Sequence, residues 1–380
     1  MKTGMMGSRR SGRFVVALGA MSLGLLVTGC DVGRDIPDAG VACADLLHHE
    51  MLGTLQLQPG FAATESAALP DAISAVTAVR SGPGYKLYGL GGTGKSLHEL
   101  GTWPNVTLGG TALQSIIAEA DRGETTYSSG FLTNDGTRLL AGYTKPGSLT
   151  NTPGTVLVYD TASPDKSTYM SAPGNYSAAA ISGYFFINGQ GIQGSASSGN
   201  AVYALKTETS PFQGSRLATF PEADVFSSAM AVTSTGVAVF GYGKYDAAEK
   251  KTINRLRAVA PATYSPALTS GTALALSDSN APEIYSGTDF FSAASFGEGV
   301  AIHRGSYDPT TFEAFTTGLS RIELTTGGID PKSVTAGEPE SVLTTHDTCT
   351  HVVELTPMGS DLLVGVQDKN GRRLVRIRKQ

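Results

Sequence analysis

The chain has 380 residues, of which 41% are hydrophobic and only 16% are charged, and it contains 47 glycines. This composition excludes wholesale disorder and favours many short strands and tight turns over long surface helices. The formal charge is −5 overall and −9 for residues 30–380. An acidic chain is a poor nucleic-acid binder, because phosphate contacts need clustered lysine and arginine.

The first 29 residues predict an export signal. Three arginines between residues 9 and 13 precede the apolar run 14–27, which is too short for a comfortable bilayer span but suits a signal peptide. The run ends in Leu-Val-Thr-Gly-Cys, which resembles the bacterial lipobox. This resemblance implies cleavage before Cys30 and acylation of Cys30 with palmitate or a similar chain, which anchors the protein in a membrane of the cell envelope. The alternative is an ordinary secretory leader with an incidental cysteine.

We therefore divide the chain into a signal peptide (1–29), a lipidated tether (30–52) and a β domain (53–380). The β domain repeats one pattern six times: an apolar strand, a glycine-bearing turn, a second apolar strand and a closing glycine. The closing glycines lie about 55 residues apart, at Gly89, Gly142, Gly189, Gly241, Gly305 and Gly365. A third strand-like run follows each of them, and several repeats show a fourth, such as 167–170 and 216–220.

The repeated four-strand pattern resembles that of the β-propeller family. This resemblance implies an all-β fold over residues 53–380, a six-bladed propeller of four-stranded sheets. The last repeat ends at its third strand, so we expect the run 53–58 to supply its fourth strand. That pairing would join the two ends of the chain and remove a sheet edge. A pair of β-sandwiches is the competing architecture.

Two cysteines, Cys43 and Cys349, remain after Cys30, and in an exported chain they predict a disulfide. A zinc site is the first alternative, and two unpaired thiols are the second. Histidines or acids flank both cysteines, at His48, His49, His346, Asp347 and His351. The sequence has no paired C-x₂-C knuckle, so we expect no metal site.

Residues 89–96 match the Walker A pattern of a nucleotide-binding loop in every position. A Walker loop needs a helix directly after its Lys-Ser, yet Gly101 and Pro104 follow within eight residues. We therefore expect a glycine-rich connection between the second and third strands of the first repeat, with no bound nucleotide. The sequence suggests no other cofactor.

In the propeller family the innermost strands start at one rim of the central channel, and ligands usually bind there. By that resemblance the candidate ligand-binding residues are the first-strand starts Tyr127, Tyr176, Phe226, Phe291 and His351. Acids stand just upstream, at Glu124, Asp224, Asp289 and Asp347, and we expect long loops at 145–154, 189–200, 241–252 and 304–318. The alternative is that the aromatic side chains only fill gaps between sheets.

The sequence favours a non-catalytic, lipid-anchored binding or scaffold protein of the cell envelope, with a small-molecule ligand or a protein partner at its channel mouth. Leader and repeats together are similar in layout to receptor-associated lipoproteins with siderophore-capturing propellers. That similarity implies a role beside an outer-membrane receptor, and it assigns no binding residue. The alternative is an exported propeller enzyme of hydrolase, lyase or quinoprotein type, for which Asp224, Asp289, Asp347 and His351 are the candidate residues.

Overall fold

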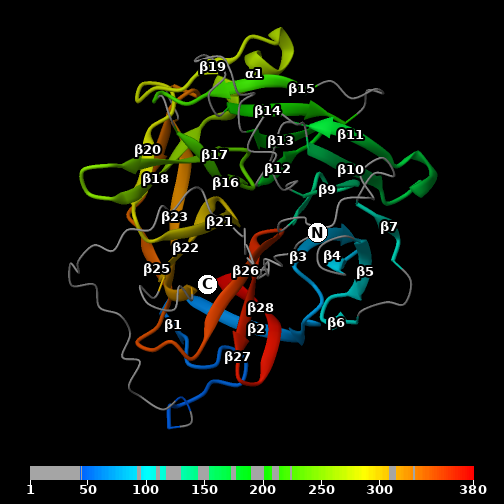
Figure 1. The fold of residues 1–380 in the computed structure, drawn as a ribbon, viewed down its shortest axis with the longest axis vertical. Coiled ribbons are helices and arrows are strands. Elements are labelled where there is room, and N and C mark those ends of the chain that lie inside the picture. Colours follow the sequence, from blue (N-terminus) through cyan, green and yellow to red (C-terminus); the bar gives the residue numbers. More distant parts are fainter. Residues whose placement is uncertain are drawn as a thin grey trace, which may run out of the picture.

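The computed structural model is a six-bladed β-propeller, with six sheets arranged around a central axis (Figure 1). It describes residues 43, 45–91, 96–107, 112–116, 130–143, 154–172, 177–189, 201–207, 214–222, 225–307, 314–327 and 330–380. The innermost strand of each sheet contacts that of the next, and the last contacts the first. The ring is therefore closed. It confirms the predicted propeller and excludes the pair of sandwiches.

Blades I to III follow one another along the chain, each running from the axis outward. Blade I consists of β3 (Ala75–Ser81), β4 (Gly84–Gly91), β5 (Ser96–Thr102) and β6 (Asn105–Val106), with β7 (Gln114–Ser115) also paired to β5. Blade II consists of β8 (Gly130–Asn134), β9 (Arg138–Tyr143), β10 (Gly154–Asp160) and β11 (Thr168–Ala172), with a 3₁₀ turn at Pro164–Lys166. Blade III consists of β12 (Ala178–Ile181), β13 (Tyr184–Gly189), β14 (Ala201–Lys206), β15 (Gly214–Thr219) and a short parallel strand, β19 (Leu274–Ala275).

Blades IV to VI complete the ring. Blade IV consists of β16 (Phe226–Val232), β17 (Ala238–Asp246), β18 (Lys251–Val259) and β20 (Glu283–Gly287). Blade V consists of β21 (Phe290–Phe296), β22 (Gly299–Tyr307), β23 (Ala314–Thr326), β25 (Glu340–Thr344), β24 (Val334–Ala336) and the short β1 (Gln56–Leu57). Blade VI consists of β26 (His351–Met358), β27 (Asp361–Asp368), β28 (Gly371–Lys379) and β2 (Phe61–Ala68).

A single α-helix occurs within the described residues, α1 (Pro261–Ser270), inserted between β18 and β20. It starts with a proline in its first turn and ends at Gly271, which adopts a left-handed conformation. Tyr264 and Ala267 bury one side of the helix against the seam between blades III and IV. In the part of the chain that the structure describes, no helix has the length and apolar character needed to cross a membrane.

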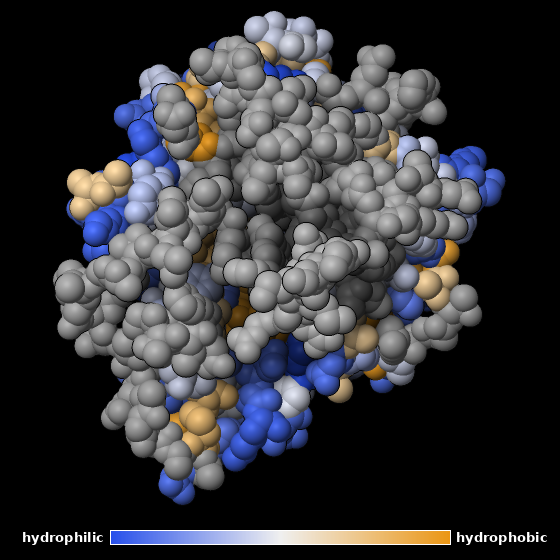
Figure 2. All heavy atoms as spheres, in the orientation of Figure 1, coloured by the Kyte–Doolittle hydropathy of each residue, from blue (hydrophilic) through white to orange (hydrophobic). Residues whose placement is uncertain are grey.

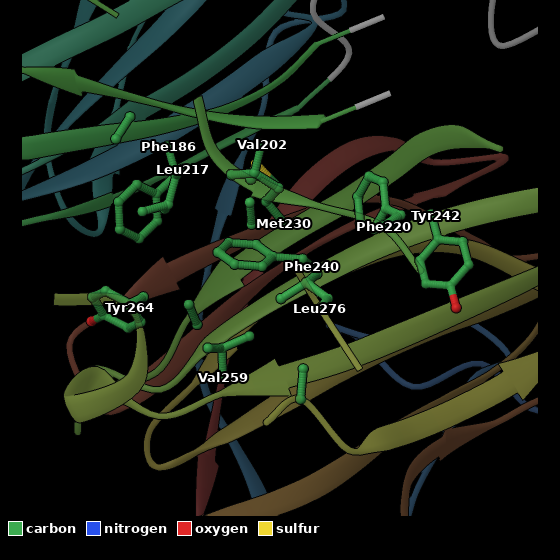
Figure 3. Close-up of a cluster of buried hydrophobic side chains, with 14 of the residues drawn as sticks. Phe186, Val202, Leu217, Phe220, Met230, Phe240, Tyr242, Val259, Tyr264 and Leu276 are labelled. Carbon is green, nitrogen blue, oxygen red and sulfur yellow. The ribbon is translucent and has the colours of Figure 1, made fainter. Parts of the chain in front are cut away.

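Six clusters of buried apolar side chains occupy the six seams between neighbouring blades. The largest joins blades III and IV, where Phe186 meets Phe240 and Tyr264 edge-on, at 6.0 and 5.6 Å between ring centroids (Figure 3). Edge-to-face packing of this kind suits the charge distribution of aromatic rings. Each blade thus buries both of its faces against its neighbours, which one sheet alone cannot do.

The closing glycines of the repeats make room for side chains of the innermost strands. A Cβ atom on Gly365 would lie 2.6 Å from Cβ of Glu354, and one on Gly305 would overlap the ring of Phe291. In both blades a first-strand side chain occupies the space beside the glycine of the second strand. The glycine period seen in the sequence therefore records a repeated packing need.

The closing strand of the ring differs from the one predicted. The run 53–58 was expected to pair with the last repeat, but its β1 pairs with β25 at the outer edge of blade V. The next segment, β2, pairs with β28 and completes blade VI. Leu52 and Leu55 are buried between blades V and VI, so the residues before β2 pack against the ring instead of extending its last sheet. The prediction of end-to-end closure is confirmed, with the strand shifted by a few residues.

Two of the four predicted long loops are extended hairpins. β17 and β18 stay paired out to Asp246 and Lys251, and β22 and β23 stay paired out to Tyr307 and Ala314. The other two, 145–154 and 189–200, lie almost entirely outside the described residues. The Walker-like segment connects β4 to β5, and Ser96 begins a strand where a nucleotide-binding loop would need a helix.

Candidate functional site

The amino-terminal segment is fastened to the rim where the innermost strands begin. Cys43 and Cys349 form a disulfide, with Cα atoms 5.6 Å apart, within the range that such bridges favour. Cys349 lies two residues before β26, so the bridge holds the start of the described chain beside the entrance to blade VI. The predicted disulfide is confirmed, and both the zinc site and the free thiols are excluded for these cysteines.

Asp347 supports this fastening. It is buried, and its Oδ1 accepts hydrogen bonds from the Thr54 hydroxyl at 2.8 Å and from the Cys349 N–H at 2.7 Å. Thr350 adds further hydrogen bonds to Thr54. The nearby His48 ring contacts the Cys43 carbonyl at 2.8 Å. In the described part of the chain, no group of three or more His, Cys, Asp or Glu side chains could hold a metal ion.

Phe291, one of the predicted ligand-binding aromatics, belongs to a cluster of rings on blade V. The Phe291 ring lies over Gly305, with the His303 ring at 5.2 Å and the Tyr307 ring at 5.1 Å, both steeply tilted to it. His303, Gly305 and Tyr307 alternate along β22 and so share one face of the sheet. Tyr307 is 53% exposed at the outer end of this row, so the cluster grades from a buried imidazole to a solvent-facing phenol.

A polar bridge joins this cluster to blade VI. The Thr316 hydroxyl accepts the N–H of Val352 at 2.8 Å and shares a hydrogen bond with His303 Nε2 at 3.1 Å. Val352 directly follows His351, which is close enough to His303 for their charges to interact. Burial, and then the neighbouring His351, lower the pKa of His303 to about 4. His303 is therefore neutral at pH 7, and the cluster presents an uncharged, partly aromatic surface at the seam between blades V and VI.

Asp289, the second described acid on this rim, is held by side chains of both blade IV and blade V. Its Oδ1 accepts the Tyr285 hydroxyl at 2.7 Å, and its Oδ2 lies 3.9 Å from Arg304. Burial raises the pKa of Tyr285, and the hydrogen bond to Asp289 acts in the same direction. The backbone carbonyl of Asp289 also accepts the Gly305 N–H at 2.7 Å. These contacts order the turn that leads into Phe291.

The other predicted site residues are placed as follows. Cys30, Tyr127, Tyr176, Glu124 and Asp224 lie outside the described residues. Phe226 begins β16, but its side chain is outside the described part. Of the predicted ligand-binding residues, the Phe291 ring packs against the buried His303 ring, and His351 lies close enough to His303 to interact with it electrostatically. His303 and Tyr307 were not predicted to belong to this site. The signal for them in the sequence is that they stand two residues before and two residues after the closing glycine, Gly305.

Glu354 is a further residue that was not predicted from the sequence. It lies on the innermost strand β26, over Gly365, where it faces blade I and takes a hydrogen bond from the Val76 N–H. Desolvation raises the pKa of this carboxyl to about 7, although that hydrogen bond, the Thr356 hydroxyl and the more distant Arg372 all act to lower it. The signal in the sequence is its position relative to the closing glycine. Glu354 contacts Gly365 in blade VI as Phe291 contacts Gly305 in blade V.

No protein-family model matches this chain, and no curated protein sequence matches it. Several solved structures are similar to it at low sequence identity. A chain of the mitotic checkpoint complex is 12% identical, with 95% of this chain and 100% of that one covered and a TM-score of 0.37. The structure of Drosophila Plexin A with Semaphorin 1b gives 10% identity, 86% and 88% coverage and a TM-score of 0.38. A candidate gluconolactonase gives 12%, 85% and 94%, and 0.40. The fold assignment rests on the six sheets themselves, and no activity is transferred from these proteins.

Proposed function

We propose that this chain is a lipid-anchored binding protein of the bacterial cell envelope, which presents its channel mouth to a small ligand or to an envelope protein. The observation that carries the proposal is the Cys43–Cys349 disulfide. Bridges of this kind persist in oxidising compartments outside the cytosol. The bridge begins thirteen residues after Cys30, the last residue of the lipobox-like sequence. The predicted export signal and the disulfide therefore both support a location in the cell envelope.

The anchor would also limit where the propeller sits. Thirteen residues span at most about 45 Å when fully extended. Because the disulfide fastens Cys43 to the rim at blade VI, the tether would end beside the channel mouth. The mouth would then stay within reach of membrane components, which is where an accessory to an outer-membrane receptor has to work.

The chemistry of the mouth favours a ligand with an uncharged aromatic or apolar part. Phe291 and Tyr307 offer ring faces and edges, and His303 is neutral in this setting. Flat apolar surface beside a few polar groups is the usual lining of a small-molecule site. In the described mouth, Asp289 and Asp347 are engaged in hydrogen bonds that order the backbone, so we do not propose a reaction for them.

Fatty-acid labelling tests the anchor. Cells that express the full chain are fed a labelled palmitate analogue, and we expect label on the wild type and none on Cys30→Ser. The Cys43→Ser variant is the control, because it removes a cysteine that the lipobox resemblance does not involve. Wild-type protein that carries no label and remains in the cytosol would rule out the lipid anchor.

Ligand retention tests the mouth. Protein purified from envelope fractions is examined by native mass spectrometry for a bound small molecule and by co-purification for a protein partner. We expect Phe291→Ala and His351→Ala to lose the ligand or partner while their thermal unfolding stays close to that of the wild type. Retention that neither variant changes would exclude the mouth as the binding site. Chemical conversion of the retained molecule would instead support an exported enzyme.

A further inference from the structure

A second candidate site lies on the outer part of blade IV, far along the sheet from the innermost strands. It is bounded by the extended β17–β18 hairpin, by β20 and by the segment before β16 that contains Glu222. The insertion that carries α1 supplies its remaining wall, including Asp278 and Pro282. Figure 2 shows this edge, at the left of the view, as hydrophilic side chains over β18 and β20. We name this region the blade IV groove.

Six side chains of alternating charge run along the groove. Arg255 bridges two acids, with Glu222 at 2.6 Å and Glu283 at 3.3 Å. Lys244 extends the row beyond Glu222 at 3.3 Å, and Arg257 extends it beyond Glu283 at 4.0 Å. Asp278 ends the row, 2.7 Å from Arg257. The order is therefore Lys244, Glu222, Arg255, Glu283, Arg257, Asp278.

The floor of this row is rigid. Arg257 is only 8% exposed, and its guanidinium donates to the Tyr242 hydroxyl at 3.1 Å and to the Ala281 carbonyl at 2.8 Å. Tyr242 is fully buried, and its hydroxyl also donates to Glu222 at 3.4 Å. A binding surface gains affinity when its polar groups are held in place before the ligand arrives. These contacts hold one cation and one acid of the groove in that way.

Stability alone is a poor explanation for the more exposed members of the row. Lys244 is 44% exposed and Glu283 is 35% exposed. Pairs at such exposure contribute at most about 1 kcal/mol each, and many contribute nothing measurable. Arg257 and Asp278 do pin the insertion to blade IV, but Lys244, Glu222, Arg255 and Glu283 are not needed for that.

The groove has the size of a small-ligand site. One hollow of about 510 Å³ is lined by Arg255, Arg257, Glu283 and their neighbours, and a second of about 360 Å³ lies toward the hairpin tip. Both hollows are lined by Glu222 and Arg255, so they adjoin at these two side chains. Ligand pockets usually measure about 300–1,000 Å³. Tyr245, which is 46% exposed, stands at the wall of the second hollow.

The positive and negative side chains that line the groove are nearly equal in number, and this balance favours an uncharged ligand. Asp246 at the hairpin adds one acid, so three cations face four acids. Such a groove has little net field with which to attract a polyanion or a polycation. A hydroxyl group both donates and accepts, and neighbouring hydroxyls can therefore satisfy a carboxylate and a guanidinium in turn. A sugar ring also has an apolar C–H face, which can be buried against an exposed tyrosine.

From this geometry we infer that the blade IV groove binds a neutral, hydroxyl-rich oligosaccharide. The sugar hydroxyls form hydrogen bonds with Glu222, Arg255 and Glu283, and one sugar ring packs against Tyr245. This site is separate from the channel mouth on blades V and VI, so it does not depend on the proposed function.

The test is an array that carries neutral oligosaccharides, acidic oligosaccharides and peptides of mixed charge, probed with the full chain purified in detergent. We expect binding to at least one neutral oligosaccharide. For that glycan, Tyr245→Ala should weaken binding about tenfold, as loss of one well-placed aromatic contact would. Glu283→Gln should also weaken it, because it replaces one carboxylate oxygen with a donor.

Tyr307→Ala is the matched control, since it removes an equally exposed tyrosine at the channel mouth. We expect it to bind the glycan as the wild type does. The inference is overturned if no neutral oligosaccharide binds, if only acidic glycans or peptides bind, or if Tyr245→Ala binds unchanged. Loss in Tyr307→Ala alone would place the sugar at the mouth, which overturns this inference and leaves the proposed function intact.

Discussion

Glu354 shows how one residue can report on the whole ring. Its carboxyl lies on the innermost strand of blade VI and is tied to the Val76 N–H of blade I, across the seam that joins the last blade to the first. Desolvation raises its pKa from 4.5 to about 7. The folded chain therefore binds this proton more tightly than the unfolded chain does. The stability linked to this proton is present below pH 4.5 and is lost as the pH rises through 7.

We expect Glu354→Gln to remove this pH dependence. The glutamine keeps the shape and stays uncharged, so its melting temperature should exceed that of the wild type at pH 8 and approach it at pH 5. Thermal unfolding from pH 5 to pH 8 measures the difference. Glu65→Gln is the control, because hydrogen bonds from Trp103 and Arg376 lower the pKa of Glu65, and its effect lies below this range. Parallel curves for Glu354→Gln and wild type would contradict the prediction.

The closing glycines allow a second test at a single residue. Gly365→Ala would place a Cβ atom 2.6 Å from Glu354 Cβ and 3.1 Å from its backbone nitrogen. Overpacking of this kind costs about 1–3 kcal/mol. Gly84→Ala is the matched control, since Gly84 also lies on a second strand but its nearest contact would be at 3.9 Å. Chemical denaturation should show a loss for the first variant and less than about 0.5 kcal/mol for the second.

At the scale of elements, the amino-terminal segment works as a fastening for blades V and VI. It contributes the disulfide, the buried Leu52 and Leu55, the Thr54 hydrogen bonds to Asp347 and Thr350, and the short strand β1. These contacts lie directly before β2, the strand that closes the ring. The fastening therefore keeps the closing strand near β28.

Removing the disulfide should weaken this fastening. The bridge closes a loop of more than 300 residues, and the chain-entropy model gives about 6 kcal/mol for a loop so long. The double variant Cys43→Ser/Cys349→Ser should lose about 2–5 kcal/mol in denaturant unfolding, because the other contacts of the segment remain. Adding reductant to the wild type should reproduce the loss, and reductant should leave the double variant unchanged. A variant as stable as the oxidised wild type would contradict the fastening role.

At the scale of the whole molecule, the ring has no free seam, because each blade shares an apolar cluster with both neighbours. The β2 strand covers β28, whose Val375 and Ile377 are fully buried. Without β2 that edge would present unpaired backbone groups, which promote association between chains.

Two truncations compare these states. A chain that starts at residue 69 lacks β2, and we expect it to aggregate or to unfold over a broad range. A chain that starts at residue 43 keeps the disulfide and β2, and we expect one cooperative transition. Differential scanning calorimetry with size-exclusion chromatography distinguishes them. A monomeric chain from residue 69 with a sharp transition would show that closure by β2 is dispensable.

Much of the architecture could be predicted from the sequence because it follows from local repetition. Alternating apolar residues and the period of the closing glycines predicted six sheets, and Cys43 and Cys349 were the only pair left for a disulfide after Cys30. Pro104, shortly after the Walker-like segment, likewise acts within a few residues. Signals of this kind need no knowledge of distant partners.

Tertiary structure alone decided what depends on contacts between distant segments. The runs 53–58 and 61–68 are neighbours in the chain, and only the structure shows that the second pairs with β28 while Leu52 and Leu55 pack between blades V and VI. The same holds for the neutral His303 beside His351, the raised pKa of Glu354 and the alternating charges along the blade IV groove. Desolvation and ion pairing depend on which side chains meet across a seam, and the order of residues along one strand does not contain that information.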